Sequence, residues 1–311
     1  MITGAAGFLG SHVVKELCAL EQYEVIAVVS GRRKAEFPYG VQVETTDLLS
    51  EQARSALMER VKPDVLCHFA WVQDKGDYRG SAVNMQWLEA STSLLRLFVE
   101  NGGKRFLFAG SSTEYGEDGG LESETYRNPV MSMYGECKKA FSSILANYCS
   151  YRGVQYVDAR YFTIFGEGDP HQFGAVPQAI SRLMNNEEFV CKAPNTIRDY
   201  IYINDAARAT AHLVTGDFCG SVNIASGQPR LMREVFQLIA DTLGKSELLS
   251  FSNRSKPSQI LVGDVRVLQD KLGLLPEHSF EEDMKRTVNW WREQSIQIGE
   301  RERERERERE R

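Results

Sequence analysis

Long apolar segments are missing from this sequence of 311 residues. A membrane-spanning helix needs about 20 consecutive apolar residues, and no stretch reaches that length. No secretory leader opens the chain either. We therefore expect no membrane partner and a cytoplasmic location.

Cysteine and histidine are few, and neither residue type forms a spaced pattern. The six cysteines contain no CxxC pair, and the five histidines show no metal-ligand spacing. Disulfide frameworks and structural zinc sites are recognised by such spacing. We therefore expect free thiols in a reducing compartment and no metal site.

An excess of positive charge is also absent. The chain has 37 lysines and arginines against 43 aspartates and glutamates, a net charge of −6. This mild acidity argues against a nucleic-acid-binding surface. An anionic substrate would then need local cations, for which Lys192 and Arg198 are the candidates. Residues 300–311 alternate Glu and Arg, and we interpret residues 299–311 as an expression tag.

Glycine, by contrast, is concentrated at the start of the chain, in Thr3-Gly-Ala-Ala-Gly-Phe-Leu-Gly10. In a dinucleotide-binding turn, Gly4 would allow the tight turn and Gly7 a close approach to the pyrophosphate. Gly10 would let the following helix pack on the sheet. The pyrophosphate would then lie on the N-terminus of helix 10–20. The β-turn-α-β context makes a chance glycine-rich turn the weaker alternative.

A second motif, Tyr134-Gly-Glu-Cys-Lys138, places a phenol and an ammonium one helical turn apart. The ammonium favours the phenolate, which is what acid–base chemistry on a hydroxyl or carbonyl needs. Ser111 follows the apolar run 105–109 and can hold the substrate oxygen by a hydrogen bond. An exposed helical pair is the alternative for Tyr134 and Lys138. With the glycine turn, these residues predict redox chemistry at a carbon–oxygen bond with a nicotinamide cofactor.

Strand-like apolar runs alternate with helical patterns through the first half of the chain. We predict strands at 24–29, 41–44, 64–69, 105–110 and 155–160, and helices at 10–20, 50–60, 81–101 and 133–152. This alternation predicts an α/β fold, a Rossmann-type doubly wound parallel sheet with its ligand at the carboxyl ends of the strands. The predicted NAD(P)-binding domain comprises 1–166 and about 199–227. A smaller C-terminal substrate-binding lobe takes about 167–198 and 228–298.

The end of the second predicted strand bears on the choice of cofactor. NAD enzymes of this fold place an acid there for the ribose 2′-hydroxyl, whereas here Val29 is followed by Ser30-Gly-Arg32-Arg33. Guanidinium groups would bind a 2′-phosphate. The sequence therefore favours NADP(H) and leaves NAD(H) open. An exposed basic loop of no consequence is the alternative.

Further ordered motifs extend this pattern from Ile2 to about Trp291. They are Thr46-Asp-Leu48, His68-Phe-Ala70, Asn84, Arg160-Tyr-Phe-Thr-Ile-Phe-Gly166, Arg198-Asp-Tyr-Ile-Tyr-Ile-Asn-Asp205, Val222-Asn-Ile-Ala-Ser-Gly227 and Gly263-Asp-Val265. In these motifs the chain resembles the extended short-chain dehydrogenase/reductase family, which includes nucleotide-sugar epimerases, dehydratases and reductases. The resemblance implies a nucleotide-sugar substrate, whose diphosphate Arg198 would hold. It also implies a homodimer through helices 81–101 and 133–152, unless both faces are buried within the monomer.

Taken together, the motifs and the resemblance define a candidate site. The catalytic residues are Ser111, Tyr134 and Lys138. The cofactor-binding residues are Gly4, Gly7, Phe8, Leu9, Gly10, Ser30, Arg32, Arg33, Asp47, Leu48, Phe69, Ala70, Tyr134, Lys138 and Tyr161. The substrate-binding residues are Ser112, Thr113, Thr163, Lys192 and Arg198.

Departures from the family pattern narrow the chemistry. The 4,6-dehydratases carry an Asp-Glu pair after the catalytic hydroxyl, where this chain has Ser112 and Thr113. The GDP-fucose-synthase branch has a cysteine at Thr113, so a built-in 3,5-epimerisation is not expected. Thr163 replaces the usual asparagine, and Glu167 a common proline.

Three functions remain in competition. We favour a reductase of the 4-keto group of a nucleoside-diphosphate 4-keto-6-deoxyhexose. The alternative is a nucleotide-sugar 4-epimerase that retains NAD through every turnover. A non-catalytic NADP-binding regulator is the remote alternative, because such proteins usually lose the tyrosine or the lysine.

Overall fold

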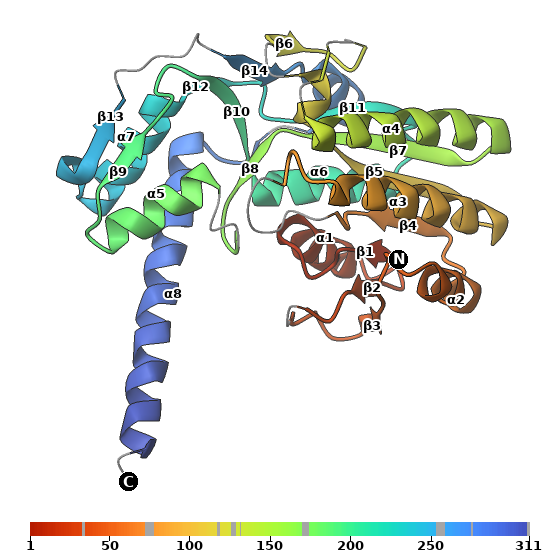
Figure 1. Ribbon diagram of the computed structural model, residues 1–311, viewed down its shortest axis with the longest axis horizontal. Helices are drawn as coiled ribbons and strands as arrows, with labels where there is room; N and C mark the ends of the chain where they lie inside the picture. Colours follow the sequence, from red (N-terminus) through yellow and green to blue (C-terminus); the bar gives the residue numbers. More distant parts are fainter. Residues whose placement is uncertain are drawn as a thin grey trace.

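The computed structural model describes residues 1–32, 35–71, 78–116, 119–125, 129–130, 132–169, 174–252, 259–274 and 276–309, with the backbone alone for 296–309. A seven-stranded sheet is its largest element (Figure 1). The strand order is β11-β7-β5-β4-β1-β2-β3, and every neighbouring pair is parallel. The predicted doubly wound α/β fold is therefore confirmed.

The elements of this first layer follow the predicted alternation closely. The strands are β1 (Ile2–Thr3), β2 (Ile26–Val29), β3 (Gln42–Thr45), β4 (Val65–His68), β5 (Arg105–Ser111), β7 (Gln155–Tyr161) and β11 (Gly220–Ile224). The helices are α1 (Phe8–Ala19), α2 (Glu51–Val61), α3 (Val83–Glu100), α4 (Met133–Arg152) and α6 (Ile203–Thr215). The predicted bounds differ from the observed ones by at most two residues. Helix α1 begins two residues before the predicted Gly10 because Gly7 already has the extended backbone of an N-cap.

Helices cover both faces of the sheet because successive strand side chains point to opposite faces. On β5, Leu107 and Ala109 join a core with α1 and α6. Phe106 and Phe108 join a core with α2, α3 and α4 on the other face. The strand is buried on both sides, which explains why it reads as a continuous apolar run.

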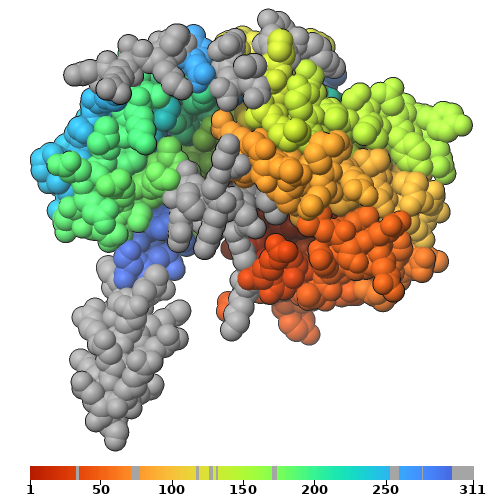
Figure 2. Space-filling model, viewed as in Figure 1, coloured from red at the N-terminus to blue at the C-terminus, as the bar shows by residue number. Residues whose placement is uncertain are grey.

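A smaller second layer is built around a mixed sheet of order β12-β10-β14-β6. Its strands are β6 (Leu121–Glu122), β10 (Ile197–Tyr202), β12 (Pro229–Leu231) and β14 (Ile260–Gly263), with β8 (Thr163–Phe165) paired to β10. β9 (Phe189–Cys191) and β13 (Leu249–Phe251) form a separate pair. Helices α5 (Ala175–Met184), α7 (Met232–Leu243) and α8 (Phe280–Arg309) share the core of this lobe. The space-filling view shows its green and blue elements to the left of the large sheet (Figure 2).

The chain passes between the two layers more than once. Between β7 in the large sheet and β8 beside the small one lies a single residue, Phe162. The chain returns through α6, which packs on α1, and through β11. Residues 197–202 lie in the small sheet, although the predicted division gave 199–202 to the cofactor domain. The assignment of cofactor and substrate roles to the lobes, like the interpretation of 299–311, stays a prediction.

Among the described residues, no helix combines the length and the apolar character needed to cross a membrane.

Candidate active site

The glycine turn closes against the end of β4. Gly4 has φ +69°, and a Cβ there would lie 2.7 Å from the backbone nitrogen of Ala70. A Cβ on Gly10 would lie 2.3 Å from the carbonyl oxygen of Gly4. No side chain therefore fits at either position, as the motif predicts.

The N-terminus of α1 is left without a side-chain cap, because its N-cap residue is Gly7. The backbone N–H groups of the first helical turn are then available to an anion, and the helix dipole favours negative charge there. Phe8 and Leu9, in this turn, are half-buried. This arrangement fits the pyrophosphate of a dinucleotide.

The other predicted cofactor residues also lie after carboxyl ends of the parallel strands. Phe69 and Ala70 follow β4, and their backbone N–H groups donate to the carbonyl oxygen (3.2 Å) and Oγ1 (3.4 Å) of Thr3. After β3, Asp47 is exposed and Leu48 is buried.

At the end of β2 the side chains of Ser30 and Arg32 are exposed, and the backbone N–H of Arg32 donates to Ser30 Oγ. Arg33 lies outside the described residues. Tyr161 is different, because its hydroxyl makes a 2.6 Å hydrogen bond with Thr210 on α6. Burial raises the pKa of that phenol.

Ser111 ends β5 and is the N-cap of a short 3₁₀ helix, η1 (Ser112–Tyr115). Its Oγ accepts hydrogen bonds from the backbone N–H (3.2 Å) and from Oγ1 (2.9 Å) of Thr113. With two donors on the oxygen, the Ser111 proton is directed elsewhere. The hydroxyl can therefore donate to a substrate oxygen.

Tyr134 lies in the first turn of α4, which is fixed by contacts that the sequence did not reveal. Ser132 caps the helix by accepting from the N–H of Gly135 at 3.1 Å. A Cβ on Gly135 would lie 2.9 Å from the carbonyl oxygen of Thr113, so α4 packs closely on η1. The buried Tyr134 ring lies edge-on to Trp71 and Tyr78.

Lys138 is buried one turn further along α4. Its Nζ donates to the carbonyl oxygen of Ala109 at 2.8 Å. The ammonium also lies 4.2 Å from the ring centre of Trp71 and 4.6 Å from that of Phe108, where cation–π attraction stabilises the charge. Burial lowers the pKa of Lys138, and the carboxylates of Glu114 and Asp158 oppose this shift.

His68 is buried near Lys138 and carries no charge of its own. The ring nitrogens contact Thr3 Oγ1 at 2.7 Å and Ser91 Oγ at 2.8 Å. Burial and the neighbouring ammonium of Lys138 lower the pKa of His68 to about 3. Its ring is therefore neutral around pH 7.

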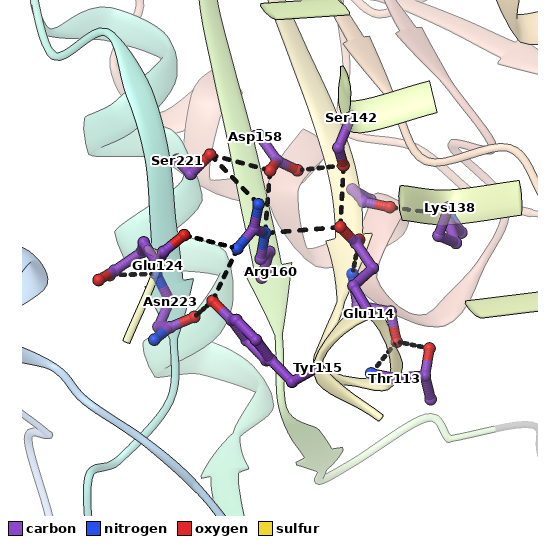
Figure 3. A network of polar contacts seen from close by, with 12 residues as sticks. Thr113, Glu114, Tyr115, Glu124, Lys138, Ser142, Asp158, Arg160, Ser221 and Asn223 are labelled. Atoms are coloured by element: carbon purple, nitrogen blue, oxygen red, sulfur yellow. Dashed lines mark hydrogen bonds and ion pairs between the residues drawn. The ribbon is translucent and has the colours of Figure 1, made fainter. Parts of the chain in front are cut away.

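A network of buried polar groups supports the site from below, and sequence reasoning missed it (Figure 3). The carboxylates of Glu114 and Asp158 both face the guanidinium of Arg160, with N–O distances of 3.5 and 3.0 Å. Arg160 Nη1 also donates to Tyr115 Oη at 2.9 Å. The sequence carried one signal of this network: an acid and a base, Asp158 and Arg160, occur together in the buried part of strand β7.

The predicted substrate residues fall into two groups. Ser112 and Thr113 lie beside Ser111 on η1. Thr163, Lys192 and Arg198 belong to the smaller layer: Thr163 is exposed on β8, and Lys192 is exposed just after β9. Arg198 is half-buried on β10 and donates to Gln259 Oε1 at 3.0 Å.

Two further observations concern Glu167, which replaces a common proline of the family, and the expected absence of a metal site. Both carboxylate oxygens of Glu167 lie 2.6 Å from the hydroxyl of Tyr202. Across the described part of the chain, no group of three or more His, Cys, Asp or Glu could hold a metal ion.

A glycine-rich turn, a helix N-terminus and a serine, tyrosine and lysine set at the carboxyl edge of a parallel sheet define a nicotinamide-dependent enzyme fold. The profile of the NAD dependent epimerase/dehydratase family matches residues 1–225, and the chain belongs to this family. The resemblance to extended short-chain dehydrogenases/reductases is thereby confirmed.

Relatives match over nearly the whole chain. A UDP-glucose 4-epimerase of Rhizobium leguminosarum bv. trifolii is 23% identical over 93% of this chain and 96% of its own length. An uncharacterized UDP-glucose epimerase of Bacillus subtilis is 28% identical over 82% and 85%. The Thermus thermophilus UDP-glucose 4-epimerase, solved in complex with NAD, superposes with a TM-score of 0.81 and 26% identity, covering 94% of this chain and 98% of that one.

Replacing Gly10 by alanine should destabilise the fold despite the better helix propensity of alanine. The new methyl group would collide with the carbonyl oxygen of Gly4, and such overpacking costs about 1–3 kcal/mol. The Gly120→Ala variant is the control, since a Cβ there meets no atom of the described residues within 4 Å. It should stay within about 0.5 kcal/mol of the native protein. Urea unfolding of both variants measures the difference, and equal stabilities would contradict the close approach.

His68 should remain neutral throughout the physiological range. The direction of its pKa shift predicts that the ring resonances of His68 do not titrate between about pH 5 and pH 8. Carbon–proton NMR of the histidine rings measures this, with His68→Gln used to assign the signal. A midpoint near the ordinary value of about 6.5 would contradict the burial of the ring.

Proposed function

We propose that this chain is an NAD-dependent 4-epimerase of a nucleoside-diphosphate hexose. The observation that carries the proposal is full-length similarity to UDP-glucose 4-epimerases in a chain that keeps Ser111, Tyr134 and Lys138. These relatives favour the epimerase over the 4-keto reductase that the sequence alone favoured. Dehydration is disfavoured because Ser112 and Thr113 stand where the 4,6-dehydratases of the family carry an Asp-Glu pair.

The residues of the site have separate tasks in this reaction. Tyr134 Oη takes the proton from the sugar 4-hydroxyl and later returns it to the same oxygen. Ser111 donates a hydrogen bond to that oxygen and stabilises the charge that develops on it. The Lys138 ammonium favours the phenolate of Tyr134. Bound NAD would supply a reversible hydride acceptor for C4, and inversion requires that the keto sugar present its opposite face before C4 is reduced again.

NAD is the cofactor that we assign. The glycine turn and the N-terminus of α1 fit a pyrophosphate, and the Thermus thermophilus relative was solved with NAD. Ser30 and Arg32 at the end of β2 keep NADP as the alternative, since neither would repel a 2′-phosphate. An epimerase needs no exchange of its cofactor, so either dinucleotide would remain bound through turnover.

The smaller lobe would bind the nucleotide sugar, with Arg198 holding the diphosphate through paired hydrogen bonds.

We also infer a homodimer, in which α3 and α4 pair with the same helices of a second copy. The outer faces of these helices expose Met85, Met133, Ile144 and Tyr151. A cytoplasmic location is consistent with six free cysteines.

The experiment that tests this function follows the cofactor together with the sugar. The purified protein is desalted, incubated with UDP-glucose and related nucleotide sugars without added dinucleotide, and the products are separated by chromatography. We expect interconversion of C4 epimers and NAD released on denaturation. Consumption of added NADPH by a 4-keto substrate would favour the reductase, and absence of turnover of either kind would favour a regulator.

Removing the phenolic hydroxyl should stop the reaction while leaving the cofactor in place. Tyr134→Phe should lower kcat about 10²–10⁴-fold, the usual cost of losing a general acid–base group. Bound NAD, measured after denaturation, should be retained, because the ring still packs on Trp71 and Tyr78. Tyr148→Phe, on the same helix and hydrogen-bonded to Arg152, is the control. Near-native activity of Tyr134→Phe would sink the assignment of the base.

A further inference from the structure

Glu114 occupies an unusual position for a carboxylate. It is 4% exposed and lies on η1, directly after the strand end that carries Ser111. Its Oε1 accepts from the backbone N–H of Ser111 at 2.7 Å, and its Oε2 accepts from Ser142 Oγ at 2.9 Å. One side chain therefore ties the end of β5 to helix α4.

The hydrogen bond from Ser142 to Glu114 matters because of where Ser142 lies on helix α4. Tyr134, Lys138 and Ser142 are spaced four residues apart, so they lie on one face of α4. A carboxylate bonded to Ser142 thus fixes Ser111 against the helix face that bears the tyrosine and the lysine. Figure 3 shows Glu114 between Arg160 on one side and Lys138 on the other.

Space for these carboxylates is provided by Gly110. A Cβ at that position would lie 2.8 Å from Glu114 Oε1 and 2.7 Å from Asp158 Oδ1. Any larger residue would displace a carboxylate from behind the strand. The glycine and the glutamate are therefore parts of one arrangement.

The charges around Glu114 form a balanced set of two acids and two bases. Asp158 and Arg160 face it from β7, and Lys138 faces it from α4. Burial and the neighbouring Asp158 raise the pKa of Glu114. The negative charge of Glu114 is in turn the first cause that raises the pKa of Lys138 against the effect of burial. Two further titratable groups lie near Lys138: His68, which is neutral, and Tyr134, whose ring centre lies 5.6 Å from the Lys138 ammonium.

We propose that Glu114 is a positioning residue of the active site, which fixes Ser111 against the Tyr134 and Lys138 face of α4 and places a negative charge behind the lysine. The proposal deepens the proposed function and rests on it. Glu114 does not touch the substrate in this arrangement. It acts through Ser111 and through the charge state of Lys138.

The decisive variant is Glu114→Gln, which keeps an oxygen for the Ser111 N–H and removes the charge. Lys138 then loses its main anion, and its pKa should fall by about one unit or more. With fewer ammonium groups at neutral pH, the phenolate of Tyr134 is less favoured. The alkaline limb of the pH profile of kcat/KM, which follows loss of the Lys138 proton, should therefore move to lower pH by a similar amount.

Two further variants separate charge from structure. Glu114→Asp keeps the charge, so the limb should stay at its native pH while kcat falls, because the shorter side chain holds Ser111 less well. Tyr115→Phe removes the hydroxyl that donates to Asn223 and accepts from Arg160, without changing any charge at Glu114. It should lower stability and leave the limb unmoved.

The titration of Lys138 provides a readout that needs no turnover. Protein labelled with ¹³Cε-lysine is titrated by NMR with NAD bound, and Lys138→Arg identifies the signal. An unchanged Lys138 midpoint in Glu114→Gln would overturn the proposal, whatever the activity. If native protein lacks epimerase activity but the midpoint falls, the proposed function fails and the role of Glu114 toward Lys138 stands.

A second route covers the case in which Glu114→Gln does not fold. Ser142→Ala removes a hydrogen bond that favours the ionised form of Glu114. Less negative charge then remains at neutral pH, and the Lys138 midpoint should fall in the same direction by a smaller amount. No movement of the midpoint in this variant would also overturn the proposal.

Discussion

The site depends on a buried cluster of two carboxyl groups, a guanidinium and an amine, which belong to Glu114, Asp158, Arg160 and Lys138. Both carboxylates face Arg160, and the side chains of all four residues are nearly inaccessible to water. A buried charge whose partner is removed costs several kcal/mol, so none of the four can be replaced independently of the rest. The hydroxyls of Ser142 and Ser221 complete the arrangement, because Ser142 Oγ lies 2.9 Å from Glu114 Oε2 and 3.0 Å from Asp158 Oδ1, and Ser221 donates to Asp158 Oδ2. Glu114 also accepts from the backbone N–H of Ser111, so the cluster contacts the end of β5 that carries the serine.

The parts of the site that depend on local spacing could be predicted from the sequence. The glycines at 4, 7 and 10 share one turn, and Tyr134 and Lys138 share one helix face. Strand and helix periodicity then placed the turn and Ser111 at the same edge of a parallel sheet. Each of these inferences needs only neighbouring residues and the geometry of one element.

The parts that depend on pairing between distant segments could not be predicted. Arg160 lies opposite Gly110 because β5 and β7 are in register at that point. A shift of one residue would have turned Arg160 to the other face of the sheet. The stacking of Trp71 over the Lys138 ammonium likewise needs the end of β4 beside α4. Such contacts join residues far apart in sequence, and a single sequence carries no record of them.

The distinction between reductase and epimerase lies outside the catalytic residues. Both reactions move a proton at Tyr134 and need Ser111 and Lys138 in the same places, so this geometry is common to both. What differs is whether the dinucleotide leaves after hydride transfer. We expect the adenosine end to lie near the exposed Ser30 and Arg32 after β2, so these residues would bear on how long the dinucleotide stays bound. Because the catalytic residues are common to both reactions, the catalytic motif predicted the family but not the reaction.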